Sequence, residues 1–138
     1  MLKYVADASV IVKWFSKDNE QERDAAISVN DELILGNIEL FAPVFLLIEA
    51  VNILHKKKRL KRNEVYSVIK ELLKIGISFR SVTENEVIQL TKIAFDYSIT
   101  MYDAQYIYLA KKLDCKLVTF DDKLLAISDL CVRPPLVV

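Results

Sequence analysis

The chain has 138 residues, of which 53% are hydrophobic and 28% are charged, a composition typical of one globular domain rather than of a disordered or fibrous protein. Its 19 basic and 19 acidic residues cancel, so any contact with a nucleic acid would have to come from a local basic patch. The presence of only two glycines and one histidine excludes a glycine-rich phosphate loop and argues against a multi-histidine zinc site. Catalytic chemistry is therefore expected to come from carboxylates, hydroxyls, or a metal ion that they hold.

The cysteines and the apolar segments indicate neither a secreted nor a membrane protein. Cys115 and Cys131 form no Cys-x-x-Cys pair, so we expect reduced core thiols rather than metal ligands. The few residues before the first aspartate are too short for a signal peptide, and no uncharged apolar stretch approaches the roughly 18–20 residues of a membrane span. We expect a single domain over residues 1–138, a soluble cytoplasmic protein and no membrane partner.

Short apolar strands alternate with amphipathic helices along the chain. In the first half, the patterns predict strands at 3–6 and 39–42, and helices at 7–15, 23–33, 44–57 and 63–75. In the second half, they predict strands at 77–82, 116–120 and 131–132, and helices at 83–97, 100–113 and 121–127. This alternation predicts an α/β fold, a three-layer sandwich with a mostly parallel central sheet and helices on both faces.

Four acidic residues from separate segments are expected at one edge of this sheet. Asp7 and Asp121 directly follow the first and fourth predicted strands, and Glu49 lies in the second turn of the helix that leaves the second strand. Asp103 begins a helix that leads into strand 116–120, so this helix starts at the same edge where that strand ends. Because ligands bind outside the carboxyl ends of parallel strands, this edge is the predicted site.

Helix capping is an alternative explanation for three of these acids. Asp7 and Asp121 are each placed as an N-cap, and Asp103 follows Thr100 with the spacing of a capping box. Glu49 has no such role, because it lies inside a helix whose apolar positions Val44, Leu47, Ile48, Val51 and Leu54 have the spacing of a buried face. Burying an unpaired carboxylate is costly, so a shared cation is expected. Oxygen ligands alone favour Mg²⁺ or Mn²⁺ over zinc.

Neighbouring polar side chains are candidates for supporting the acids. Ser9 follows Asp7 by two residues, Thr119 precedes Asp121 by two, and Asn52 lies one turn after Glu49. Each of them could orient a carboxylate or a water molecule. Ordinary capping or a surface position is an equally good explanation for each.

Four segments in order carry a family resemblance. They are "VADASV", "LLIEAVNIL", "YDAQYIYLA" and "LVTFDDKL", and together they hold the four acids and the three supporting residues. In their order and spacing the sequence resembles a PIN domain, and specifically the small VapC-type toxins of prokaryotic toxin–antitoxin pairs. No single segment is specific, whereas the ordered set covers nearly the whole chain.

The resemblance implies a PIN-like fold and a Mg²⁺- or Mn²⁺-dependent endoribonuclease. On that basis Asp7, Glu49, Asp103 and Asp121 would bind the metal and act in catalysis, with Ser9 and Thr119 supporting them and Asp122 as a further acid of the last segment. It also implies cleavage of cellular RNA, a small antitoxin protein as partner, and a homodimer.

Two further features are open to more than one explanation. The run "HKKKRLKR" is either a solvated helix end or a surface for RNA phosphates, formed by Lys56, Lys57, Lys58, Arg59, Lys61 and Arg62. Tyr102 and Tyr106 are predicted on the core-facing side of the helix at 100–113, although one exposed ring could instead stack on a base.

Other functions are also to be weighed. An aspartyl-phosphate phosphatase would need a second aspartate two residues after the first, where this chain has Ser9, and no middle strand ends in the aspartate that a receiver domain would need. A PIN-like interaction module without activity and a DNA or flap nuclease with the same chemistry remain alternatives.

Overall fold

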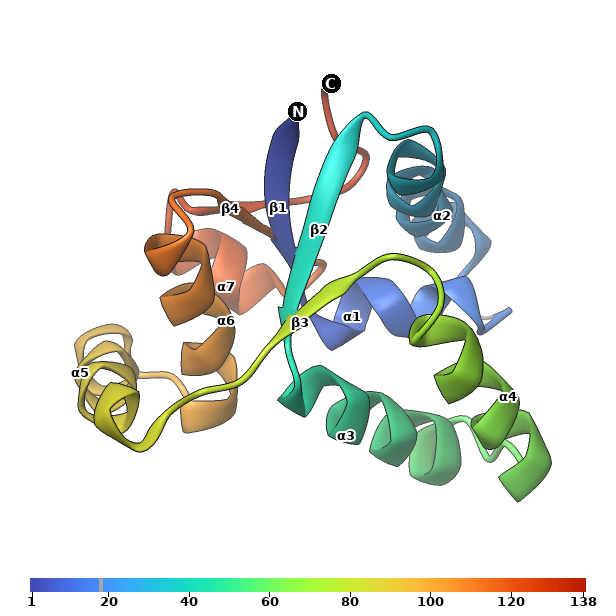
Figure 1. Cartoon of the computed structure of the whole chain (residues 1–138), viewed down its shortest axis with the longest axis horizontal. Coiled ribbons are helices and arrows are strands. Elements are labelled where there is room, and N and C mark those ends of the chain that lie inside the picture. The colour runs from blue at the N-terminus through green and yellow to red at the C-terminus, as the bar shows by residue number, and fades with distance from the viewer. Residues whose placement is uncertain (18) are drawn as a thin grey trace.

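Five parallel strands form one sheet in the computed structural model, which describes residues 1–17 and 19–138 (Figure 1). The order across the described part of the sheet is β3-β2-β1-β4-β5. The strands are β1 (Leu2–Ala6), β2 (Ile38–Pro43), β3 (Ser78–Arg80), β4 (Lys116–Val118) and β5 (Cys131–Val132). The predicted α/β fold is therefore confirmed, and every observed strand pair is parallel.

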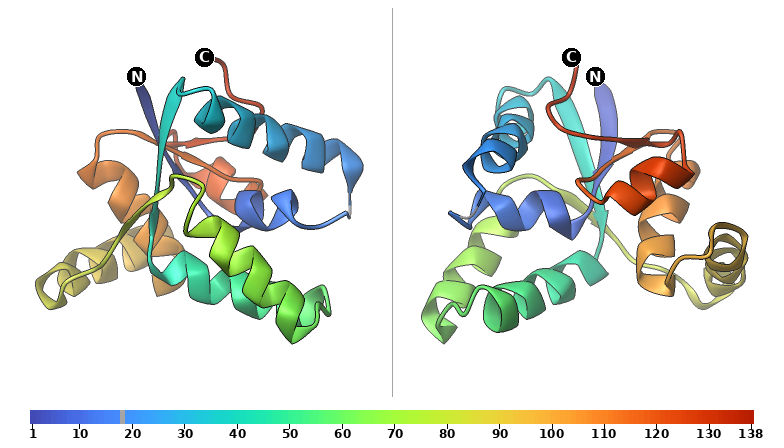
Figure 2. Two further views of the ribbon diagram at one scale, coloured as in Figure 1. Left: turned by 45° about the vertical axis from the view of Figure 1, so that its right-hand side comes forward. Right: turned by 180° about the vertical axis from the view of Figure 1, so that it is seen from behind.

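Helices cover both sides of the sheet, as Figure 2 shows from two directions. The side with the earlier helices has α1 (Ala8–Ile11), the 3₁₀ turn η1 (Val12–Trp14), α2 (Glu20–Ile34), α3 (Phe45–Asn52), the π-helical turn η2 (Ile53–Lys57) and α4 (Arg62–Leu72). The other side has the 3₁₀ turn η3 (Glu84–Glu86), α5 (Val87–Tyr97), α6 (Met101–Lys112) and α7 (Asp122–Ile127). None of the helices in the described ranges is long and apolar enough to cross a membrane.

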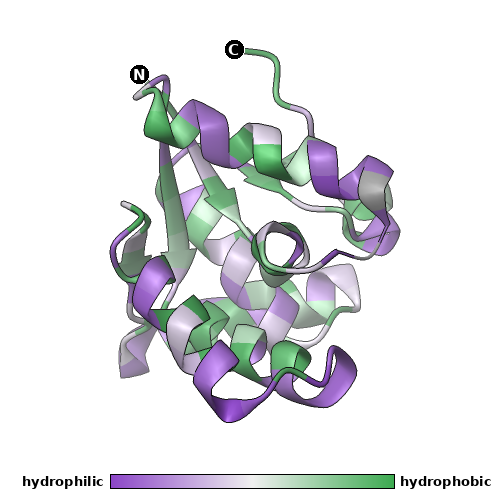
Figure 3. Ribbon diagram, turned by 90° about the vertical axis from the view of Figure 1, so that its right-hand side faces the viewer, coloured by the Kyte–Doolittle hydropathy of each residue, from purple (hydrophilic) through white to green (hydrophobic). Residues whose placement is uncertain are grey.

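The core lies along the central strand β1. Tyr4 of β1 is in register with Leu40 of β2 and with Lys116 of β4, so β1 has a parallel neighbour on each side. Val5 and Ala6 are completely buried. In Figure 3 much of the strand ribbon has the green of hydrophobic residues, whereas the outer helices and loops carry most of the purple of hydrophilic residues. This arrangement places the end of β1, where Asp7 follows, between the helices of both layers.

The apolar face predicted for the helix after β2 is wrong at three of its five residues. Val44, Ile48 and Val51 are exposed, Ile48 by 62%. Leu54 is buried as predicted and Leu47 is partly buried, and the buried residues of α3 itself are Leu46 and Ala50. Almost every residue between 44 and 54 is apolar, so the hydrophobic spacing could not identify the face that the sheet would cover.

Two other predictions need correction. The strand predicted at 116–120 ends at Val118, although the Thr119 amide still donates to the Val132 carbonyl at 3.0 Å. Tyr102 does not point into the core and is 58% exposed, whereas Tyr106 is buried as predicted. The two tyrosines are four residues apart but Tyr102 lies in the first turn of α6, beyond the part of the helix that the sheet covers.

Candidate active site

Asp7 joins β1 to α1 and is both a helix cap and a buried carboxylate. Its backbone is extended, and Oδ1 accepts a hydrogen bond from the Ser9 amide at 3.0 Å, so it caps α1 as the capping alternative predicted. The residue is only 6% exposed. The Ser9 hydroxyl donates to Oδ1 at 2.6 Å, and the Thr119 hydroxyl donates to Oδ2. Capping therefore accounts for one of several contacts of this carboxylate.

The same two hydroxyls connect Asp7 to the segment after β4. The Phe120 amide donates to the Ser9 hydroxyl oxygen, and the Asp121 amide donates to the Thr119 hydroxyl oxygen, both at 3.0 Å. Asp121 in turn caps α7, because its Oδ1 accepts from the Lys123 amide at 2.9 Å. Ser9 and Thr119 thus fix the position of Asp121 relative to Asp7.

Glu49 approaches this cluster from α3 and accepts a hydrogen bond from the hydroxyl of Tyr106 on α6. Tyr106 is 1% exposed, and burial and the Glu49 charge raise its pKa far above its usual value, so the hydroxyl keeps its proton and donates. From the sequence, only core packing was predicted for Tyr106. The available signal was the spacing of Tyr106, which is three residues after Asp103 and on the same side of α6.

Three of the acids have raised pKa values, to which the charges of other acids contribute. Burial, with a smaller contribution from the charge of Asp103, raises the pKa of Asp7 to about 6 despite the hydrogen bonds from Ser9 and Thr119. Burial is also the main cause of the raised pKa of Glu49, with smaller contributions from Asp7 and Asp103. Asp103 has a raised pKa because of burial and then because of Asp121. Charges of neighbouring acids thus contribute to the pKa shifts of Asp7, Glu49 and Asp103.

A cation suits this donor set, although the side chains do not surround a common point. Among the described residues, no group of three or more His, Cys, Asp or Glu side chains is arranged to hold a metal ion. Asp7 and Glu49 instead accept hydrogen bonds from hydroxyls of the chain. The donors are all carboxylate oxygens and three of them have raised pKa values, so a hard divalent ion such as Mg²⁺ or Mn²⁺ would offset their repulsion.

Two of the predicted supporting residues lie outside this hydrogen-bond network. Asn52 is exposed at the end of α3. Asp122 is exposed and forms an ion pair with Arg133 at 3.0 Å, and Arg133 also bonds Glu22 at 2.7 Å. Arg133 therefore ties the C-terminal segment to α7 through Asp122 and to α2 through Glu22.

The basic run is divided between two surfaces. Lys57 and Lys58 line a cavity of about 340 Å³ together with Ser9 and Lys13, so this part of the run is next to α1 and the Asp7 network. Lys61 and Arg62 line a different cavity, of about 600 Å³, between η2 and α4. Only the first part of the run is near the acids.

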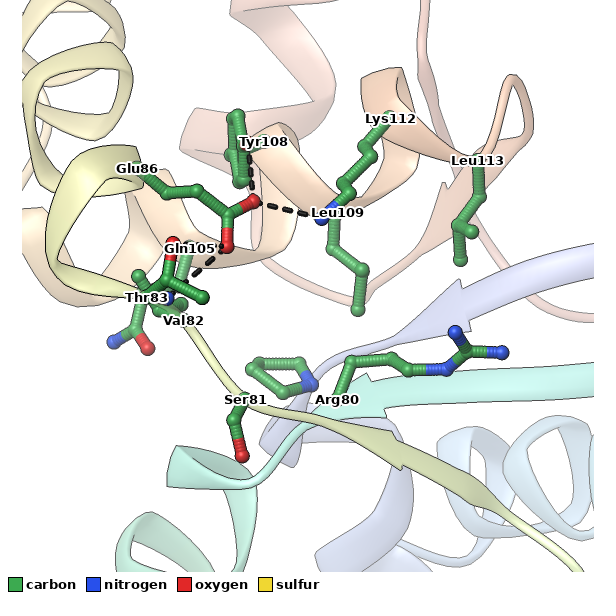
Figure 4. A pocket seen from close by; sticks show the side chains of 11 residues that line it. Arg80, Ser81, Val82, Thr83, Glu86, Gln105, Tyr108, Leu109, Lys112 and Leu113 are labelled. Carbon is green, nitrogen blue, oxygen red and sulfur yellow. Dashed lines mark hydrogen bonds and ion pairs between the residues drawn. The ribbon is translucent and has the colours of Figure 1, made fainter.

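A third cavity contains the carboxylate of Glu86, which is separate from the four acids described above. It has about 190 Å³ and lies between the segment after β3 and α6 (Figure 4). There the Glu86 carboxylate accepts hydrogen bonds from the Tyr108 hydroxyl, the Lys112 amine at 2.8 Å and the Thr83 amide at 3.0 Å. The Glu86 carboxylate is thus bound by three groups of the protein itself. Tyr108 and Glu86 form a second tyrosine–carboxylate pair, outside the acidic cluster.

The parallel sheet in the order 3-2-1-4-5 and the acids at its carboxyl edge define a class of protein. The PIN domain model matches residues 4–130, and the chain belongs to the PIN domain family. Among curated proteins it is similar to the "Exonuclease VapC9" of Pyrobaculum aerophilum, with 34% identity over 125 residues that cover 91% of this chain and 85% of the relative.

Two further proteins extend the comparison. The "Ribonuclease VapC3" of the same organism is 28% identical over 128 residues, covering 89% of this chain and 92% of the relative. The crystal structure of Mycobacterium tuberculosis VapC20, described as a sarcin-ricin loop cleaving toxin, has a TM-score of 0.71 at 16% identity and covers 95% of this chain and 99% of that one. This last likeness shows the shared fold.

Proposed function

We propose that this chain is a Mg²⁺- or Mn²⁺-dependent endoribonuclease and the toxin of a VapBC-type toxin–antitoxin pair. The observation that carries the proposal is the hydrogen-bond network that joins Asp7, through Ser9 and Thr119, to the segment of Asp121, together with the bond from Tyr106 to Glu49. The charges of Asp7 and Asp103 also raise the pKa of Glu49, and the charge of Asp121 raises that of Asp103. The names of the relatives, which include a ribonuclease and a toxin, support the substrate and the biological role. On this proposal the chain is a single cytoplasmic domain that forms a homodimer and binds a small antitoxin.

Each residue of the network has a distinct part in the proposed reaction. Asp7, Glu49, Asp103 and Asp121 would hold the metal, which supplies an activated water for attack on the RNA phosphodiester. Ser9 and Thr119 hold Asp7 and set the distance to Asp121. Asn52 and Asp122 are also predicted to support the site, although neither belongs to the hydrogen-bond network around Asp7.

A cleavage assay on three substrates tests this function. Linear RNA, circular RNA and DNA of the same sequence are incubated with the antitoxin-free protein in Mg²⁺, in Mn²⁺ or in EDTA. We expect cleavage of both RNAs, little cleavage of DNA, and none of any substrate in EDTA. Cutting of the circular RNA is decisive for an endonuclease, since a circle has no ends.

Other outcomes identify the alternatives. Shortening of the linear RNA with an intact circle would assign an exonuclease, the activity that the name of the 34% identical relative states. Preference for DNA would assign a DNA or flap nuclease. A folded protein that cleaves none of the substrates would be an interaction module.

Tyr106→Phe is expected to weaken Mn²⁺ binding by about 10-fold. The change removes only the hydroxyl that donates to Glu49, and loss of a partner that orients a metal ligand typically costs 10- to 100-fold in affinity. Titration calorimetry with Mn²⁺ measures the change. Tyr108→Phe is the matched control on the same helix, because it removes a hydroxyl that donates to Glu86 instead. Equal Mn²⁺ affinity of the two variants would show that Tyr106 does not position Glu49.

A further inference from the structure

Two aromatic rings stack on each other at the starts of α3 and α6. Phe45 is the first residue of α3 and Tyr102 is the second residue of α6. Their ring centroids are 5.0 Å apart and their planes differ by 7°. Phe45 is half-buried, whereas Tyr102 is 58% exposed. The pair therefore presents a large, flat aromatic ring to solvent in a fixed orientation.

Each ring of the stacked pair shares its helix with one of the acids. Phe45 is four residues before Glu49, so the two side chains lie on one side of α3, about 5–6 Å apart at their Cβ atoms. Tyr102 directly precedes Asp103. Phe45 is thus one helical turn from Glu49, and Tyr102 is next to Asp103 in the chain, so the ring pair lies near two of the acids.

We infer that the exposed ring of Tyr102, supported from behind by Phe45, stacks on a nucleobase of single-stranded RNA next to the phosphodiester that is cleaved. This inference rests on the proposed function. Aromatic rings bind bases through their π-faces with little dependence on sequence. Phe45 holds the plane of the tyrosine ring, so little side-chain freedom is lost when a base binds.

Binding of oligoadenylate in EDTA measures this contact without cleavage. With fluorescein-labelled RNA and fluorescence anisotropy, we expect Tyr102→Ala to weaken binding by about 5- to 100-fold, the range typical of losing one base–aromatic stack. Tyr102→Phe keeps the ring and is expected to bind within about twofold of the wild type. Phe95→Ala is the matched control, since Phe95 is an 80% exposed ring on α5 rather than on α3 or α6.

Oligoadenylates with one abasic position identify the base that stacks. At one position, removal of the base is expected to weaken binding to the wild type as much as Tyr102→Ala does, and to have no further effect on the variant. Equal binding by the wild type and Tyr102→Ala would overturn the inference. So would equal loss at every abasic position, or no measurable binding by the wild type.

A purely structural role of the ring pair has a different signature. If the stack only holds α3 against α6, Tyr102→Ala will lower the melting temperature and the Mn²⁺ affinity, and the abasic series will be unchanged, which overturns the inference. The cleavage assay tests the nuclease separately. Intact cleavage without dependence on Tyr102 rejects the stacking alone, and stacking without cleavage rejects the nuclease alone.

Discussion

Asp7→Asn is expected to lower metal-dependent RNA cleavage by on the order of 10³-fold, which corresponds to about 4 kcal/mol of transition-state stabilisation. The asparagine has nearly the same shape and can still accept hydrogen bonds from Ser9, so the segment between β1 and α1 should keep its conformation. What it loses is the negative charge of the most buried acid in the cluster and one of the two oxygens that accept from Ser9 and Thr119. Single-turnover cleavage rates at saturating Mg²⁺ measure the effect.

The control for this variant is Asp96→Asn, which removes a charge from an exposed position on α5. It is expected to cleave RNA at the wild-type rate. A cleavage rate for Asp7→Asn within about tenfold of the wild type, in a preparation free of wild-type enzyme, would remove Asp7 from the proposed catalytic residues.

The second large effect is a change of stability with pH in the metal-free protein. The pKa of Asp7 is about 6 in the folded chain and 3.8 ordinarily, so the folded state holds this proton more tightly than the unfolded state does. Stability is therefore lost as pH rises from about 4 to about 6, and above pH 6 the full cost is present. That cost is roughly 3 kcal/mol. Urea unfolding in EDTA at several pH values measures it.

Comparison with Asp7→Asn separates this contribution from those of other acids. The variant has no proton to lose at this position, so its unfolding free energy relative to the wild type should increase by up to about 3 kcal/mol between pH 4 and pH 7. Other acids, such as Glu86, titrate in both proteins, so their contributions largely cancel in the difference between the two unfolding free energies. A difference that stays constant with pH would contradict the raised pKa of Asp7.

The sequence predicted the sheet and its helices well because the relevant patterns are local. Short apolar runs that end at Asp7 and Pro43 are recognisable without knowledge of their partners, and the parallel arrangement follows from the helices between them. The covered face of α3 could not be predicted, because its residues are apolar on nearly all sides. Only the packing of the chain decided that Ile48 would be exposed.

For the site, the sequence predicted where each acid lies in the fold: Asp7 and Asp121 each cap a helix, Glu49 lies in the second turn of α3, and Asp103 lies in the first turn of α6. Their hydrogen-bond partners could not be predicted, because Tyr106 is 57 residues from Glu49 and Thr119 is 112 residues from Asp7. A tyrosine in an apolar helix is expected to be a core residue, and its hydroxyl acquires a partner only when α3 and α6 meet. The sequence did indicate that Thr119 could orient a carboxylate, and the one it contacts is Asp7.

The central position of β1 has a consequence for local unfolding. The Asp7 amide donates to the Val118 carbonyl at the middle of the sheet, so exchange of its proton with solvent requires a large part of the sheet to open. Glu49 and Asp103 are on α3 and α6, which lie on different sides of β1 and can detach at a lower free energy (Figure 1). Glu49 and Asp103 are therefore near Asp7 only while α3 and α6 are both packed against the sheet. A ligand bound to all of these acids would couple the local unfolding of α3 to that of α6.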